Sequence, residues 1–421
     1  MLVQNKFLVL YSMLGLLFAD INVAETIQLE RSPTVTLSSL TQYVYKHHPS
    51  LHTEQAQQQQ IDANTALATT PFANVSSVSV NHQNDVIGSH DGLQEWEASV
   101  GMPLWLPGQK QQQLLLSDKL SAELPAYKQQ IRLQASATIR ELIWHAVLAE
   151  TADKQALQAW NTAQNLEQDV DSKVAAGELA AAESLLASSH TLELYSQYLL
   201  TQAALAHALK QYHHRTGEQA LPQDYEEVLS IQQDRLQHHS SAIIDPQHPD
   251  LKVLDQHIAT LHTKQDLARF EGAVNPELSL GIRRERGSDD ENYNNSVGIG
   301  ISFALGNDVY RRPAIALAAK ELADAEVTRQ QVEHELNAVL FSQLHDLASK
   351  QQQLDLENQR VETSRQYFSL QQRAFELGEI DLVSVLHSQS IANKAQNRKL
   401  RLQIEMKQLI AQINQARGVA L

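Results

Sequence analysis

The chain contains an internal repeat: four short segments of its first half return in the same order in its second half. His48-Pro49-Ser50-Leu51 returns at 248–251, the strand-like segment 99–102 at 298–301, Gly177-Glu178 at Gly378-Glu379, and 215–217 at 416–418. The offset is 199 to 201 residues in every case. A period of this kind indicates a duplicated structural unit. Each half is therefore expected to form the same succession of elements.

Each half reads as helix, two strands, long helix and helix. The strand predictions rest on strict alternation of apolar with polar or small residues, as in the run from Trp96 to Leu104. The predicted strands are Val75 to His82, Glu95 to Leu104, Glu277 to Arg284 and Ser296 to Phe303, within regions of about 72–104 and 277–304. They approach the 9 to 11 residues that a tilted strand needs to cross a bilayer. Loops rich in Asn, Asp, Ser and Gly join each pair, at 83–94 and 285–295.

The helical signal is strongest where glycine is absent, from Gln109 to Ala176 and from Asn307 to Leu377. Each segment allows a helix of roughly 100 Å at 1.5 Å per residue. Apolar residues recur every seven positions, at Leu340, Leu347, Leu354, Val361, Phe368 and Phe375, and at Leu185, Leu192, Leu199 and Ala206. This narrow seam predicts coiled-coil packing. The helices Leu37 to Thr70 and Leu179 to Tyr212 have half that length, and Pro125 predicts a kink or a helix break.

Composition limits the class of protein. An apolar stretch after Lys6 and a small residue at Ala24 resemble a secretory signal peptide over residues 1–24. The chain has no cysteine, which excludes disulfides, thiolate zinc sites and cysteine nucleophiles. A formal charge of -16 argues against nucleic acid as a partner. Beyond residue 24, no apolar run approaches the ~20 residues of a transmembrane helix, so a membrane could be crossed only by strands.

Four strands per chain cannot close a barrel, because transmembrane barrels begin at about eight strands. An open sheet edge in lipid would leave backbone groups without hydrogen bonds. We therefore expect several subunits to pool their strands, and their helices to pack side by side around a polar lumen. The predicted fold is mainly α with a small β part. It is a duplicated helix–strand–strand–long helix–helix unit that builds a long α-helical barrel and a shared transmembrane β-barrel.

With these features the chain resembles the outer-membrane factor (TolC-like) family of tripartite efflux systems. The resemblance implies a homotrimer with a twelve-stranded barrel in the outer membrane of a Gram-negative bacterium and a helical barrel in the periplasm. It implies as partners a periplasmic adaptor protein, an inner-membrane pump of the RND type and outer-membrane lipid. The segment Pro103-Leu104-Trp105-Leu106-Pro107-Gly108-Gln109 most resembles the branch that serves heavy-metal-cation pumps, which suggests a role in metal resistance.

The expected function is a passive export duct for small solutes, heavy-metal cations among them. The expected organisation is a signal peptide (1–24), a first repeat (25–217), a linking equatorial segment (218–246), a second repeat (247–418) and a short tail (419–421).

The candidate functional positions lie at the ends of the long helices. Gly177-Glu178 and Gly378-Glu379 read, on sequence alone, as glycine helix stops followed by an acidic residue. The resemblance implies that these turns form the periplasmic tip, where the adaptor docks. Repeated around a ring, the acidic residues near the turns would attract cations. Related channels carry aspartates shortly after the second turn, where this chain has Ser384 and His387, so Glu183 and Asp381 are the acidic candidates for the entrance.

Catalytic, cofactor and metal sites are not expected. No GxSxG, HExxH or glycine-rich phosphate motif occurs. His48 and His52 have helical i, i+4 spacing, and His213-His214 and His238-His239 are adjacent pairs, but no third ligand stands near them. Two other functions remain open. A periplasmic coiled-coil adaptor would not need two strand pairs, and a soluble helical scaffold would leave the apolar strand faces unexplained.

Overall fold

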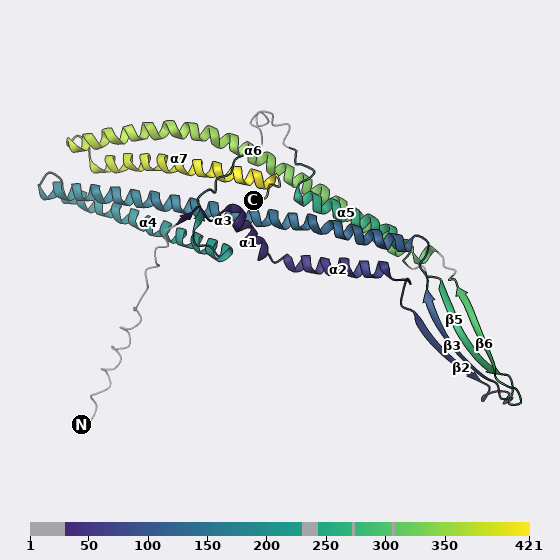
Figure 1. Cartoon of the computed structure of the whole chain (residues 1–421). Coiled ribbons are helices and arrows are strands. Elements are labelled where there is room, and N and C mark those ends of the chain that lie inside the picture. The colour runs from purple at the N-terminus through teal and green to yellow at the C-terminus, as the bar shows by residue number, and fades with distance from the viewer. Residues whose placement is uncertain (1–29, 230–242, 272–273, 305–307) are drawn as a thin grey trace, which may run out of the picture.

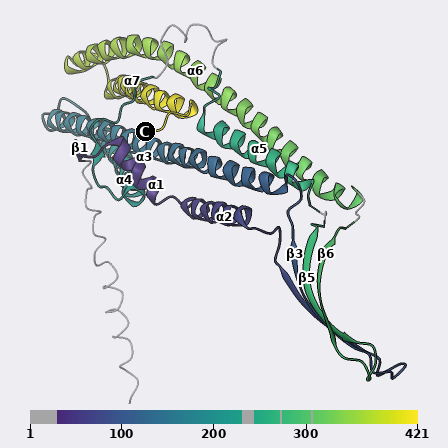
Figure 2. The same cartoon turned by 45° about the vertical axis from the view of Figure 1, so that its right-hand side comes forward.

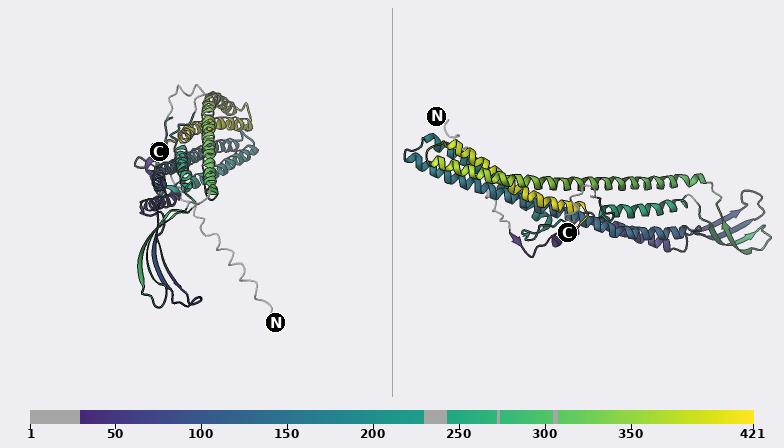
Figure 3. Two further views of the ribbon diagram at one scale, coloured as in Figure 1. Left: turned by 90° about the vertical axis from the view of Figure 1, so that its right-hand side faces the viewer. Right: turned by 90° about the horizontal axis from the view of Figure 1, so that it is seen from above.

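The structure is a computed structural model that describes residues 30–229, 243–271, 274–304 and 308–421. The molecule is elongated, with four long strands at one end and the helices extending away from them (Figure 1). Figure 3 shows that the two longest helices, α3 (Gln109–Ala175) and α6 (Arg312–Glu376), run along most of the helical part. The predicted signal peptide, residues 1–24, lies outside the described residues.

Both halves of the chain form the same elements in the same order. The first half contains α2 (Leu51–Thr69), β2 (Ser77–Asn84), β3 (Gln94–Pro103), α3 and α4 (Ala181–Thr216). The second contains α5 (Pro249–Ala268), β5 (Glu277–Arg286), β6 (Asn294–Ser302), α6 and α7 (Leu382–Ala416). Outside this order stand α1 (Leu37–Lys46), a 3₁₀ turn (Asp308–Tyr310) and a short parallel ladder of β1 (Arg31–Ser32) with β4 (Leu221–Pro222). The mainly helical fold predicted from the sequence is confirmed.

The predicted single helix from Leu37 to Thr70 is wrong, because it is broken at the His-Pro pair into α1 and α2. Pro49 has no backbone N–H to continue the ladder of α1. In the second half Pro249 begins α5, where the missing N–H is not needed. The Nδ1 atom of buried His248 accepts a hydrogen bond of 3.2 Å from the backbone N–H of Asp250 and so caps α5. Burial lowers the pKa of His248, which favours this neutral, accepting form.

The long helices follow their heptads. The residues from Leu340 to Phe375 at seven-residue spacing are buried or half-buried, and Leu340 and Phe375 pack in clusters with side chains of α7. The alternative of a helix break at Pro125 is wrong, because α3 is continuous through it. Leu120 and Leu124 pack there against Ile61 of α2 and Leu267 of α5, which hold the helix on both sides. None of the helices in the described ranges is long and apolar enough to cross a membrane.

The four long strands form one antiparallel sheet in the order β2-β3-β5-β6. The strand bounds lie within two residues of those predicted. The register places the predicted apolar residues on a single face, as in the row Val78, Val100, Leu280 and Ile299. The next row, Ser79, Ser99, Gly281 and Gly298, lies on the opposite face. The sheet therefore has one apolar and one polar surface over its whole width.

In the half of the molecule far from the sheet, the helices form a layer in the order α4, α3, α7 and α6 (Figure 2). Near the middle of the elongated molecule, α1, α3 and α4 enclose a large core around Trp144 and Tyr212. Buried Arg140 pairs there with Glu227 at 2.7 Å, which fixes the segment that follows β4. In the half far from the sheet, no other helix of the described residues packs against the outer faces of α4 and α6.

Candidate functional site

The two turns at the end of the helical layer, Gly177 and Gly378, have the same backbone geometry. Their φ angles are +78° and +77°, a left-handed conformation that favours glycine. In the first turn, the N–H of Glu178 donates to the carbonyl of Lys173 at 2.9 Å, and the N–H of Gly177 to that of Val174 at 3.0 Å. The second turn has the same two bonds, from Glu379 to Ala374 and from Gly378 to Phe375. Both are Schellman motifs that satisfy the last carbonyls of α3 and α6.

The space in front of these glycines is open. Apart from the adjacent residues, a Cβ added at Gly177 or Gly378 would meet no heavy atom of the described chain within 4 Å. Glycine is therefore required by the left-handed backbone and not by a close neighbour. The exposed backbone of both turns can be approached by a partner.

The two turns differ in how the following helix begins. Asp381 caps α7, since its Oδ1 accepts a hydrogen bond of 2.9 Å from the backbone N–H of Ser384. Hydrogen bonds from the side chain and the backbone of Ser384 lower the pKa of Asp381. At the start of α4 the corresponding residue is Ala180, which provides no side-chain cap. The first turn of α4 holds Glu183 instead, favourably placed against the helix dipole.

The remaining entrance candidates are displayed unequally. Glu178, Glu379 and Asp381 are exposed, as is His387, while Ser384 is half-buried. Glu183 is also half-buried, and its Oε2 atom is enclosed without a hydrogen-bond partner among the described residues. The tip therefore displays three carboxylates openly and a fourth in part.

The structure brings the two tips together at one end of the molecule (Figure 1). Val170 of α3, Ala187 of α4, Phe375 of α6 and Leu382 of α7 form one buried cluster. The ammonium group of Lys173 lies 4.8 Å from the centre of the Phe375 ring, close enough for a cation–π contact. The four candidate turn residues are thus held on one packed unit.

Sequence reasoning missed two contacts at this tip. Ser184 donates a hydrogen bond of 2.6 Å to Oδ1 of Asp171 and ties α4 to α3. Asp171 stands six residues before Gly177 and Ser184 seven residues after it, a spacing that brings residues of a helical hairpin face to face. The contact between Ser184 and Asp171 could therefore be predicted from the sequence. The contact of Lys173 with Phe375 could not, because it joins the two repeats.

The described histidines are not gathered into a metal site. Within the described ranges, no group of three or more His, Asp or Glu side chains is placed to hold an ion. His48 instead accepts a hydrogen bond of 3.3 Å at Nδ1 from the backbone N–H of Ser50, much as His248 does in the second repeat. His238 and His239 lie outside the described residues.

Comparisons with known proteins agree with this architecture. Residues 246–419 match the family described as outer membrane efflux protein. No match was found among the curated proteins. The outer membrane protein VceC from Vibrio cholerae is 13% identical, with a TM-score of 0.68, covering 91% of this chain and 96% of that chain.

Two further solved structures are similar over nearly their whole length. The outer-membrane channel OprN is 18% identical, with a TM-score of 0.66 and 96% of each chain covered. The MtrE outer membrane channel of Neisseria gonorrhoeae, in its open state, is 14% identical, with a TM-score of 0.59, covering 95% of this chain and 97% of that chain. At these identities the likeness is one of fold. With the family match, it confirms the predicted resemblance to outer-membrane factors.

Proposed function

Because residues 246–419 match the outer membrane efflux protein family and the described chain has the fold of outer-membrane channels, we propose that it is one subunit of an efflux channel. Its strands lie in the outer membrane and its helices extend into the periplasm. It is a passive duct for small solutes and performs no covalent chemistry. In this proposal residues 1–24 are a signal peptide, and the repeats 25–217 and 247–418 are joined by 218–246.

One observation supports an assembled duct above all: both outer helices of the layer carry rows of exposed leucines at heptad positions, seven or fourteen residues apart. On α4 these are Leu185, Leu192 and Leu199, with exposed fractions of 74%, 64% and 44%. Leu356 and Leu370 of α6 are two heptads apart, and Leu377, which follows the last residue of α6, is one heptad further on; their exposed fractions are 66%, 67% and 69%. The α4 row is a predicted coiled-coil seam, yet α4 packs on α3 through other residues and leaves this row uncovered. Such rows are typical of a seam that awaits a partner helix.

The two uncovered rows lie at opposite edges of one helical layer, so α4 of one copy can pack against α6 of the next. A contact between two different surfaces closes into a ring when the rotation is right. The sheet has the same property, since β2 and β6 are its two edge strands. Pairing β2 of one copy with β6 of the next satisfies their free backbone groups in lipid. We infer three copies from the resemblance, which gives a barrel of twelve strands.

The proposed partners follow from the two ends of the duct. A periplasmic adaptor docks at the open turns around Gly177 and Gly378, and an inner-membrane pump of the RND type supplies the cargo. Outer-membrane lipid surrounds the apolar face of the sheet. The resemblance of the segment 103–109 to the heavy-metal branch makes metal cations the proposed cargo, with a role in metal resistance.

The alternative of a periplasmic adaptor is not supported, because the family match and the similar structures are those of outer-membrane channels. A soluble scaffold leaves the apolar sheet face without a role. Its exposed side chains include Val78, Val80, Val297 and Ile299, each at least 67% exposed in the single chain. A surface of this kind marks a protein or membrane contact.

Cysteine crosslinking tests the ring directly, since the chain has no cysteine of its own. Leu185 lies eight residues after Gly177 and Leu370 eight residues before Gly378, so both stand at one level above the tip. The double variant L185C/L370C should give disulfide-linked multimers in outer membranes. The pair A187C/L370C is the control, because Ala187 faces α3 and is buried within the subunit. Failure of every pairing between the α4 and α6 rows would exclude the ring.

A further inference from the structure

The apolar face of the sheet ends in a distinct row of side chains near its loops. His82, Trp96, Arg284 and Asn295 are register partners across β2, β3, β5 and β6. The row lies two positions beyond Val80, Ala98, Ile282 and Val297, on the same face. His82 stacks on Trp96, with ring centroids 4.0 Å apart. This face therefore changes from aliphatic to aromatic and cationic toward the loops.

Two adjacent arginines on β5 have opposite surroundings. Arg283, on the polar face, is paired with Glu95 at 2.7 Å and with Glu285 at 2.6 Å. Arg284, on the apolar face, has no carboxylate within 4.0 Å among the residues that the structure describes. A charge without a counterion is rare on an apolar surface. Arg284 is thus an unneutralised cation at the border of the aliphatic band.

An aromatic ring holds Arg284 in place without using its hydrogen-bond donors. The guanidinium carbon lies 4.4 Å from the centre of the Tyr293 ring. The hydroxyl of Tyr293 donates to Oε1 of Gln94 at 2.5 Å, which fixes the ring. A stacked guanidinium keeps the N–H groups at its edge free, and these fit the oxygens of a phosphate.

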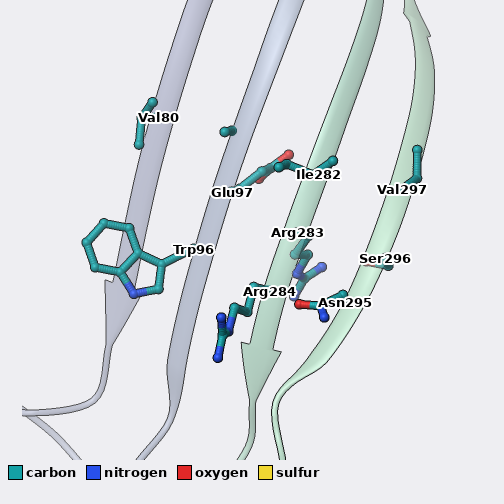
Figure 4. A pocket seen from close by; sticks show the side chains of 10 residues that line it. Val80, Trp96, Glu97, Ile282, Arg283, Arg284, Asn295, Ser296 and Val297 are labelled. Carbon is teal, nitrogen blue, oxygen red and sulfur yellow. The ribbon is translucent and has the colours of Figure 1, made fainter.

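A hollow lies directly beside this arginine. Figure 4 shows Trp96 of β3 and Arg284 of β5 at one level of the sheet, with Val80, Ile282 and Val297 farther along the strands. The volume of the hollow is about 440 Å³. Trp96 and Arg284 lie at one end and aliphatic side chains along the rest, so the hollow is itself amphipathic; Glu97, Arg283 and Ser296, at the alternate positions of the strands, also contribute to its lining.

We propose that this hollow binds a membrane lipid with a phosphate-bearing headgroup, its phosphate on Arg284 and an acyl chain along Val80, Ile282 and Val297. The inference rests on the proposed function, which places this face in lipid and the helices in the periplasm; the loops, at the other end of the strands, then lie outside the cell. The lipid is then one of the outer leaflet. The site is complete within one chain, so it is present in every subunit of the ring and remains open to lipid when β2 and β6 pair with neighbouring copies.

The test uses the purified full-length assembly in detergent, with lipid binding counted by native mass spectrometry. The probes are bisphosphorylated lipid A and the same lipid with its phosphates removed. The wild type should prefer the phosphorylated form roughly tenfold, the effect of one charge-assisted hydrogen-bonded contact. Arg284→Gln should abolish the preference. Arg283→Gln, which removes the same charge from a neighbouring residue that is already neutralised by Glu95 and Glu285, should retain it.

One further variant and one competition measurement make the result decisive. Arg284→Lys, which keeps the charge, should retain part of the preference even if Arg284→Gln assembles poorly. Inorganic phosphate should not displace the lipid, and displacement would mean a simple anion site and overturn the proposal. Equal loss in the Arg283 and Arg284 variants, or no preference in the wild type, would overturn it as well. A crosslinked α4–α6 ring without phosphate preference refutes the lipid site alone, whereas absence of the ring refutes the channel.

Discussion

The backbone N–H of Asp289 donates a hydrogen bond of 3.1 Å to the carbonyl oxygen of Asp91 and joins the two loops at the free end of the sheet. Gly92 lies against this contact with a φ of +94°. A Cβ at Gly92 would stand 2.5 Å from the carboxylate carbon of Asp289. The carboxylate of Asp85 accepts hydrogen bonds from the backbone N–H groups of Asp91 and Gly92. The two hairpin loops therefore form one ordered cap.

Peptide tags at two positions test separately on which side of the membrane the loops lie and whether the contact between them is needed for assembly. Inserted after Ile87, which is fully exposed, a tag should be labelled by antibody on intact cells with normal assembly. Inserted at Gly92, it breaks the contact with Asp289 and should lower the amount of assembled protein. Labelling of the Ile87 tag only after permeabilisation would reverse the proposed orientation.

The two faces of the sheet should respond oppositely to a new charge. Val80→Arg places a cation on the apolar face, where it costs about 2 to 4 kcal/mol near the bilayer midplane. Asn81→Arg is the matched control, because Asn81 lies on the polar face, where Glu97 is its register partner on the next strand. The heat-modifiable multimer in the outer-membrane fraction should fall for Val80→Arg and remain for Asn81→Arg. Equal recovery of both variants would argue against burial of this face in lipid.

The helix caps at the tip provide a test of local stability. Ala180→Asp gives α4 the side-chain cap that it lacks and should stabilise its first turn by about 1 kcal/mol. Amide hydrogen exchange in that turn should slow about fivefold. Unchanged exchange would show that the turn is stabilised by packing alone.

The cap that α7 already has should depend on pH. Hydrogen bonds from Ser384 lower the pKa of Asp381 in the folded chain. Its contribution is therefore complete above the ordinary aspartate pKa and is lost as the pH falls through the lowered value. Exchange in the first turn of α7 should quicken at acid pH in the wild type, while Asp381→Ser should remove this dependence and keep a cap.

The sheet and the long helices were predictable because one local pattern determines each. Alternation fixed both the strands and the face of residues such as Val100 and Ile299, and the heptads fixed the row from Leu340 to Phe375. The break at Pro49 was predictable from the proline, yet it was obscured by the helical composition on both sides. Pro125 shows the reverse, since packing of Leu120 and Leu124 keeps α3 continuous.

Contacts between distant residues set the limit of sequence reasoning. Leu185 and Leu340 belong to equally regular rows, but only the structure shows that one row is covered within the chain and the other is not. Arg283 and Arg284 are adjacent and chemically identical. Only the neighbouring strands decide that Arg283 is paired with a carboxylate of the described chain and Arg284 is not. At the tip, Gly177 and Gly378 were recognisable as helix stops, while the exposure of their backbone depends on how the two hairpins pack.

The carboxylates at the tip should govern the preference for cations. Replacing Glu178, Glu183, Glu379 and Asp381 by their amides removes the negative potential that a ring of subunits would focus at the entrance. The cation preference in planar bilayers should fall severalfold. Amides at the exposed positions Asp118, Glu321, Glu326 and Asp346, remote from the tip, form the control with equal net charge. An unchanged preference in the tip variant would remove these carboxylates from the conduction path.

Gly378 should be a point of adaptor engagement, and its two possible roles can be separated by substitution. Gly378→Trp fills the open space in front of the turn, whereas Gly378→Asn keeps that space and tolerates the left-handed backbone. Because no described residue other than the adjacent ones lies within 4 Å of the new Cβ, only the φ of +77° opposes the tryptophan, at roughly 1–2 kcal/mol. The assembly should therefore survive in normal amounts in the outer membrane.

Export and adaptor crosslinking report the docking function of this turn. Gly378→Trp should lose both, since a bulky side chain blocks approach to the backbone, while Gly378→Asn should retain both. Gly177→Trp, at the matching turn with equally open space, shows whether the two repeats contribute equally. A joint loss of multimer and export in Gly378→Trp would indicate a folding defect. Full export and unaltered crosslinking in both tryptophan variants would leave these glycines as helix stops and place the docking surface elsewhere.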